Sequence, residues 1–240
     1  MHHPVVRELE ELVSGDDDAW SQVLAWRAAA SRRVEIVPAT PEDGRATLLA
    51  LQITTRSPMG ALALRCGGLL IDHGWLRILG ARNPRIGDGL REWNGSLGGL
   101  PLDPPLDDAL VVAYDAVGGF FALNRGNWDA APGTLHYLGP GDYAWQGFEL
   151  GYSEFMQWAM SDDLEAFYQG SRWAGWQAEV ERLGPDQAMS IYPPLGFEAS
   201  ADGYRKRSSV PARELWTFHH SLSRQLGEHP AGSDFRIELK

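Results

Sequence analysis

The chain has little lysine or cysteine and no long apolar run. Of its 240 residues, two are lysine (Lys206 and Lys240) and one is cysteine (Cys66). A lone cysteine cannot form an intrachain disulfide, which excludes an extracellular disulfide scaffold and favours a reducing setting. No segment reaches the roughly 20 apolar residues of a membrane helix, and the first residues lack the apolar stretch of a signal peptide. We therefore expect a cytoplasmic protein without a membrane partner.

The charge balance is acidic. The formal net charge is −11. Proteins bind phosphate backbones through clustered basic residues, whereas acidic residues are in excess here. The composition therefore argues against a nucleic-acid partner. The same charge suits solubility, or binding to a basic protein. With 44% hydrophobic and 22% charged residues, the composition is ordinary for a soluble globular protein.

The usual signatures of catalysis and metal binding are missing as well. The sequence contains no H-E-x-x-H, paired-cysteine, G-x-x-x-x-G-K-[ST] or G-x-S-x-G motif. His219 and His220 are neighbours on a predicted helix, so their side chains point about 100° apart and do not converge on one ion. We expect neither a metal nor a cofactor. Oligomeric state is left open.

Turn and helix signals predict a single α+β domain over residues 1–240. A helical part over 1–53 precedes a sheet core over 54–152, and a second helical part covers 153–240. Pairs of short apolar runs separated by glycine-rich turns, such as 110–114 and 120–124, predict β-hairpins. Strands that follow one another with tight turns form an antiparallel meander, so the expected sheet is antiparallel and flanked by helices.

The C-terminal part is expected to be mainly helical. Ser153 is a good N-cap for one helix, and residues 173–183 predict another. A long helix is expected over 210–226, with Pro211 near its start. The polar segment 199–209 reads as a loop, and the tail after residue 227 as loose chain or a strand at 235–239.

The stretch from Thr54 to Gly80 carries the candidate site. Apolar runs at 61–65 and 69–71, joined by Gly67-Gly68, predict a hairpin, and 75–79 predicts a further strand. A polar loop precedes the first run, so polar side chains can gather at the ends of the hairpin. The candidate binding residues are Thr55, Arg56, Ser57, Asp72, His73, Trp75 and Arg77.

Asp72 and His73 invite a catalytic interpretation as an acid–base dyad. Adjacent residues on a strand point to opposite faces, so the two can cooperate only if the strand breaks at Asp72-His73-Gly74. The structural alternative is a turn in which Asp72 accepts hydrogen bonds from local amides. Arg77 would then form a surface or interface ion pair.

Tryptophan is abundant, at 10 residues. Most of these residues lie in apolar segments, which favours packing in the core or in a protein interface. A sugar- or nucleotide-binding module would instead need at least two exposed on one surface, from the set Trp75, Trp93, Trp128 and Trp145.

Four segments resemble an uncharacterised bacterial family, domain of unknown function 2625. They are T-T-R-S-P-M-G-A (54–61), I-D-H-G-W-L-R-I-L-G (71–80), G-G-F-F-A-L-N (118–124) and G-Y-S-E-F-M-Q-W (151–158). The resemblance covers most of the chain. It implies no activity, because that family has no established one to carry over.

A second set of segments is similar to the SUKH superfamily: 110–113, 118–124, 133–137, Trp145 and 153–155. This resemblance implies an α+β fold with an antiparallel sheet. It also implies a binding function, since many bacterial members are immunity proteins that neutralise toxins and others are adaptors. The chain departs from the superfamily in its helices after residue 160 and in its N-terminal pattern.

Two main functions follow. The leading interpretation is a non-catalytic, immunity- or adaptor-like protein that binds a basic, toxin-like protein. The alternative is a small-molecule hydrolase or a ligand-binding protein. It requires Asp72, His73 and Arg56 or Arg77 to converge in a cleft with Ser57 or Thr55.

Overall fold

The computed structural model describes residues 6–15, 17–95, 102–142, 144–195 and 205–227. Its helices are α1 (Leu9–Leu12), α2 (Trp20–Ala29), α3 (Pro41–Leu51), α4 (Pro58–Arg65), α5 (Leu90–Trp93), α6 (Tyr152–Ala159), α7 (Asp163–Tyr168), α8 (Trp176–Val180) and α9 (Ala212–Gly227). Its strands are β1 (Val34–Val37), β2 (Gly68–Ile71), β3 (Leu76–Leu79), β4 (Ala109–Asp115), β5 (Phe120–Asn124), β6 (Leu135–Leu138), β7 (Gln146–Gly147), β8 (Gln187–Tyr192) and β9 (Lys206–Pro211).

The strands confirm the predicted α+β fold with an antiparallel meander. Seven strands form one sheet in the order β1 to β7, and β8 pairs with β9 in a second sheet. Every pair of neighbours is antiparallel. The main sheet begins earlier than predicted, because β1 pairs with β2, with Val34 opposite Ile71.

The predicted strand at 61–65 is wrong, because these residues belong to helix α4. Ser57 caps the helix by accepting a hydrogen bond from the Gly60 amide at 3.1 Å, and Pro58 occupies the first turn. The segment contains no β-branched residue, and its alanines, leucines, methionine and arginine favour helix. Gly67-Gly68 therefore links α4 to β2, and the hairpin turn lies at residues 72–74.

Three predictions for the C-terminal part also need correction. Helix α6 begins at Tyr152 with Gly151, and not Ser153, as its N-cap. The helix predicted over 173–183 is reduced to α8, because Gly175 in front of it has a φ of 77°. Residues 206–211 form strand β9 in place of a loop, and Pro211 ends that strand. The predicted loop at 199–204 and tail strand at 235–239 lie outside the described residues.

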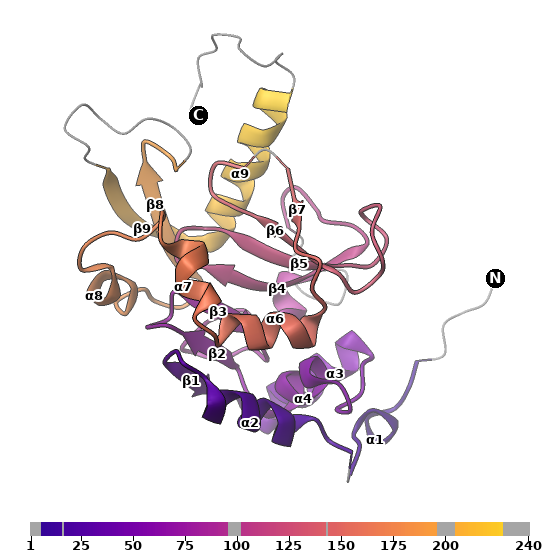
Figure 1. Cartoon of the computed structure of the whole chain (residues 1–240). Coiled ribbons are helices and arrows are strands. Elements are labelled where there is room, and N and C mark those ends of the chain that lie inside the picture. The colour runs from indigo at the N-terminus through magenta and orange to yellow at the C-terminus, as the bar shows by residue number, and fades with distance from the viewer. Residues whose placement is uncertain (1–5, 16, 96–101, 143, 196–204, 228–240) are drawn as a thin grey trace.

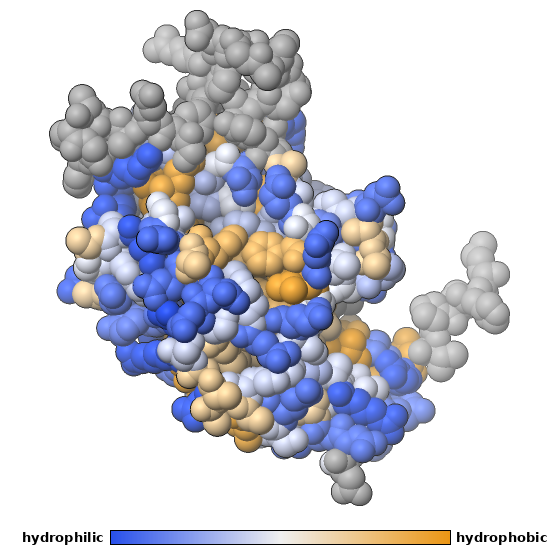
Figure 2. Space-filling model, viewed as in Figure 1, coloured by the Kyte–Doolittle hydropathy of each residue, from blue (hydrophilic) through white to orange (hydrophobic). Residues whose placement is uncertain are grey.

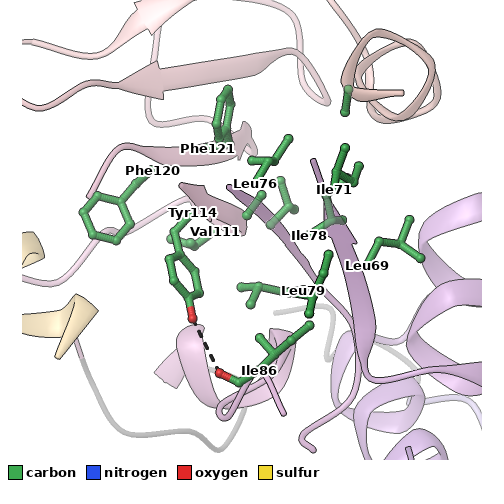
Figure 3. Packing of buried hydrophobic residues seen from close by; sticks show 14 of the residues in the cluster. Leu69, Ile71, Leu76, Ile78, Leu79, Ile86, Val111, Tyr114, Phe120 and Phe121 are labelled. Carbon is green, nitrogen blue, oxygen red and sulfur yellow. Dashed lines mark hydrogen bonds between the residues drawn. The ribbon is translucent and has the colours of Figure 1, made fainter. Parts of the chain in front are cut away.

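The core lies on both sides of the main sheet. Every residue of β2, β3, β5 and β6 is buried, so other elements cover both faces of these strands. Helices α2–α4 lie below the sheet in Figure 1, and α9 lies above it. Figure 3 shows how the side chains from successive strands pack together, among them Leu69, Ile78, Val111 and Phe120. Arg77 in β3 is consequently carried into the interior, where it is 2% exposed.

The β4–β5 turn is held by one buried carboxylate. Asp115 accepts hydrogen bonds from the Val117 and Gly119 amides at 3.0 and 2.7 Å. It also accepts from the hydroxyls of Tyr137 and Tyr168 at 2.8 and 2.9 Å. Burial raises the pKa of Asp115 and these hydrogen bonds oppose the rise. The carboxylate thus connects the turn to β6 and α7.

Replacing Asp115→Ala should lower the free energy of unfolding by at least about 3 kcal/mol, because four buried donors lose their acceptor. Urea titration measures the loss. Asp129→Ala, at an exposed aspartate, is the control and should change stability little. Equal stabilities for the two variants would contradict this account of the turn.

Helix α9 buries His219 against the sheet. Its ring packs edge-on to Phe120, with centroids 6.2 Å apart, and Nδ1 has no hydrogen-bond partner among the described residues. Burial lowers the pKa of His219 to about 4. The folded state therefore holds a neutral imidazole at a pH where the unfolded chain binds a proton.

We expect acidification from about pH 6.5 towards pH 4 to destabilise the protein, because the unfolded state takes up the proton that folded His219 refuses. A pKa lowered from 6.5 to about 4 corresponds to roughly 3 kcal/mol. His219→Leu should flatten the dependence of unfolding free energy on pH in this window, as measured by urea titration at several pH values. An unchanged slope in the variant would refute the assignment.

Candidate functional site

The residues predicted to form one site lie in two places. The Ala19 amide, just before α2, donates to the Thr55 carbonyl at 2.8 Å. The Asp72 amide donates to the carbonyl of Arg33, beyond the other end of α2, also at 2.8 Å. The two groups are separated by a helix of 10 residues, or about 15 Å. The structure therefore does not bring Ser57 or Thr55 together with Asp72 and His73, as the hydrolase alternative requires.

Thr55, Arg56 and Ser57 connect the N-terminal helices. Thr55 is fully buried, and its Oγ1 accepts from the Ser14 amide at 2.8 Å. Ser57 caps α4. Arg56 is exposed, with Asp17 3.9 Å away as its ion-pair partner. Thr55 and Ser57 are thus committed to backbone groups of the fold.

The β2–β3 turn has an uncommon backbone. Asp72, His73 and Gly74 have φ angles of 51°, 62° and 84°. Such left-handed conformations are uncommon outside glycine, and aspartate, asparagine and histidine adopt them more readily than most residues. The strand thus breaks where the dyad interpretation requires. The two side chains nevertheless diverge: Asp72 pairs with Arg172 at 2.6 Å, and His73 Nδ1 lies 2.7 Å from Glu181 Oε1.

Asp72, His73, Trp75 and Arg77 all contact one segment, residues 168–184. The Trp75 ring meets the rings of Tyr168, Trp173 and Trp176, with centroids 5.0–5.7 Å apart. Arg77 donates to the carbonyls of Gly184 and Leu183 at 2.9 and 3.3 Å. The cluster seen in the sequence is therefore the interface on which the connection from α7 to β8 docks.

The environment of Arg77 differs from the ion pair that the structural alternative predicted. It is buried and forms no ion pair with the described residues, whereas a surface or interface pair was expected. Besides the two carbonyls it donates to the Tyr114 hydroxyl at 3.4 Å. Its guanidinium charge is thus compensated by dipoles and not by a carboxylate.

Asp72 and Arg172 form a buried ion pair inside an aromatic box. Their side chains are 10% and 9% exposed. The Arg172 guanidinium lies 5.0 Å from the Trp75 ring and 4.3 Å from the Trp176 ring. Breaking such a pair leaves one charge buried without a partner, which costs more than the pair itself contributes.

Asp72→Asn should therefore destabilise the protein by about 3 kcal/mol, since Arg172 keeps its charge in the box. Asparagine also tolerates the left-handed backbone, so the variant tests charge alone. Adding Arg172→Met should recover part of the loss in a double-mutant cycle measured by urea titration. Strictly additive effects would show that the two side chains are not coupled.

The four tryptophans that a sugar- or nucleotide-binding module could use separate into two groups. Trp75 and Trp93 are fully buried. Trp128 and Trp145 are half-buried neighbours with centroids 5.1 Å apart, and Trp128 stacks on His136 at 4.0 Å. One pair thus reaches a common surface, where His136 covers one face of Trp128. A sugar- or nucleotide-binding role for this pair stays a prediction.

Three surface cavities surround the end of α2. One of about 270 Å³ includes Arg33, His73 and Glu181 in its lining. A second, of about 280 Å³, includes Asp72, Arg172 and Trp176. The third, of about 430 Å³, lies between α2 and the α6–α7 corner. Each lining includes residues from 157–181, which are distant in sequence from α2 and the hairpin, so no local pattern indicates that they contribute.

Metal ligands and a reactive thiol are two further features by which the described residues could support chemistry. These residues contain no cluster of three or more His, Cys, Asp or Glu side chains placed to hold a metal ion. Cys66 is buried, and burial raises the pKa of its thiol to about 12. Nor does any helix of the described parts have the length and apolarity to cross a membrane.

Comparison with known proteins places the chain in a family. A family model described as "Protein of unknown function DUF2625" matches residues 9–215. The chain belongs to this family. It is 36% identical over 219 residues to the putative uncharacterized protein YbfG of Escherichia coli K12. The matched residues make up 90% of this chain and 97% of YbfG.

A second relative is an uncharacterized protein of Haemophilus influenzae. It is 35% identical over 190 residues, which cover 79% of this chain and 83% of the relative. No solved structure matches the chain. The similarity to the SUKH superfamily therefore stays a prediction, while membership of the DUF2625 family is established.

Proposed function

We propose that the protein is a non-catalytic, immunity- or adaptor-like binding protein that recognises a basic protein partner. The observation that supports this proposal is the groove between α2 and the α6–α7 corner, which combines an apolar floor with an acidic rim. A toxin-like partner is what the SUKH resemblance implies. The groove would be the place where a segment of that partner binds.

The floor of the groove suits an apolar side chain. It includes Trp26, Ala29 and Ala30 from α2 and its end, and Met160 from the end of α6. The Ser31 amide donates to the Met160 carbonyl at 3.1 Å, which fixes the two walls relative to each other. Figure 2 shows apolar residues over α2, in the lower part of the view, among mostly hydrophilic side chains. Half-buried tryptophans of this kind commonly dominate binding energy at protein interfaces.

The rim of the groove is acidic. Asp162 and Asp163 line it, and Glu165 follows in the first turn of α7. Arg32 bridges Asp162 and Glu165 at 2.7 and 2.6 Å. One cation thus faces three carboxylates, so the rim keeps a negative balance. Hydrogen bonding to Arg32 lowers the pKa of Asp162, which keeps this carboxylate ionised near neutral pH. Charge complementarity favours a lysine- or arginine-bearing segment.

A photo-crosslinking residue at position 157 tests the groove in living cells, because Gln157 is exposed and lines it. Gln22 is the control position: it is an exposed glutamine on α2 that does not line the groove. We expect a basic protein to crosslink at position 157 and not at position 22. The captured protein is then produced in pure form and titrated against variants.

Trp26→Ala should weaken binding by about 2 kcal/mol, or roughly thirtyfold, if the floor is the anchor. Asp162→Asn/Asp163→Asn should weaken it severalfold and reduce its dependence on salt. Glu10→Gln/Glu42→Gln makes the same charge change elsewhere on the exposed surface and should leave affinity unchanged. Identical crosslinks at both positions, or full affinity in a folded Trp26→Ala variant, would refute the proposal.

A further inference from the structure

We propose that the cavity beside the β2–β3 turn binds a small molecule through its carboxylate group. The cavity measures about 270 Å³, and its lining includes Arg33, Glu35, His73, Arg85 and Glu181. These residues come from four segments of the chain that are separate in sequence. The site is separate from the α2–α6–α7 groove, and none of its lining residues lines that groove.

The cavity rests on one face of the sheet. Glu35 pairs with Leu70 across β1 and β2, and Leu70 pairs with Arg77 across β2 and β3, so the three residues share that face. Leu70 contributes to the lining. Arg77 reaches from the same face to the carbonyls of Leu183 and Gly184, shortly after Glu181. The floor is therefore rigid, and the charged side chains stand around it.

An intramolecular carboxylate already shows how the cavity can hold such a group. Glu181 Oε1 lies 2.8 Å from Arg33 Nη1 and 2.7 Å from His73 Nδ1. Both distances are those of charge-assisted hydrogen bonds. The left-handed turn presents His73 to the Glu181 carboxylate. The hydrogen bond from the Asp72 amide to the Arg33 carbonyl keeps the two donor segments together. Arg33 and His73 thus form a two-donor receptor for one carboxylate oxygen.

Glu181 is suited to give way to a ligand. Its side chain is 43% exposed, and its described contacts in the cavity are the two donors themselves. Rotation of the side chain towards water would release both donors without changing the buried interface. A ligand carboxylate would then take the position of the Glu181 carboxylate and meet the same two partners.

The charge around the cavity favours an anion once Glu181 has moved. Arg33 and Arg85 are then the arginines of the lining, and Glu35 is its remaining carboxylate. No ion pair joins Arg85 to any described residue, so its guanidinium is available to a second oxygen. Two arginines thus stand against one carboxylate, in a chain of net charge −11. This contrast distinguishes the cavity from a surface that only suits a basic partner.

Isothermal titration calorimetry of the full chain with succinate tests the site, with inorganic phosphate as a second probe at constant ionic strength. Wild type should bind succinate weakly, because Glu181 competes. Glu181→Ala should bind it about tenfold more tightly, since the internal competitor is gone. Arg33→Ala and Arg85→Ala, made in that background, should each lose about tenfold. Arg27→Ala changes an exposed arginine on α2 outside the cavity and should have no effect.

Thermal melts establish that each variant is folded, and Glu181→Gln replaces Glu181→Ala if the alanine variant is not. Failure of both wild type and the folded Glu181 variant to bind succinate with a Kd near 1 mM or tighter would overturn the proposal. Binding of phosphate without succinate would overturn the assignment to a carboxylate. Succinate binding that is indifferent to Arg33→Ala and Arg85→Ala would place the ligand elsewhere. None of these results depends on a protein partner, so they are independent of the proposed function.

Discussion

The burial of Trp75 holds the two halves of the molecule together. Its ring is fully buried between the β2–β3 hairpin and the segment from Tyr168 to Trp176. Its carbonyl accepts a hydrogen bond from the Ala116 amide at 2.7 Å, which ties it to the end of β4. Tyr168 in turn donates to Asp115. A continuous path of packed rings and hydrogen bonds therefore runs from the Asp72–Arg172 pair to the β4–β5 turn.

Local signals were sufficient for most of the sheet. Glycine turns between short apolar runs correctly predicted the antiparallel order around β4 and β5, and the cap at Thr40 with Pro41 marks the start of α3. Residues 61–65 form a helix and not a strand because helix-forming residues fill this segment, and Gly67-Gly68 links that helix to β2. Regular structure is also shorter than predicted at α8, because the left-handed Gly175 delays the start of that helix to Trp176.

The site could not be predicted in the same way, because its partners are distant in sequence. The sequence placed Asp72, His73, Trp75 and Arg77 near one another, which the hairpin confirms. Nothing near residue 72 indicates that Arg172 is its partner, or that Glu181 is the partner of His73. Conversely, the polar character of Thr55 and Ser57 reflects helix ends and not a binding surface. A charged residue in a run as apolar as β3 was the available hint that Arg77 would be buried.

Arg32 and Arg33 illustrate how short-range geometry divides the surface. They are adjacent in the bend between α2 and β1, and their side chains reach different partners. Arg32 reaches Asp162 and Glu165 on the groove side, and Arg33 reaches Glu181 on the cavity side. The ion pairs beside the groove and beside the cavity thus begin at neighbouring residues.

The order of the strands has a consequence for how the chain folds. Because β1 to β7 pair in sequence order, each new strand can join the growing sheet as soon as it leaves the ribosome, without waiting for distant sequence. Trp75 then stays uncovered until residues 168–184 have been made, about a hundred residues later. Between these two events the nascent sheet exposes a large aromatic side chain, and a ribosome pause before residue 168 would prolong the exposure of the surface on which the native structure depends.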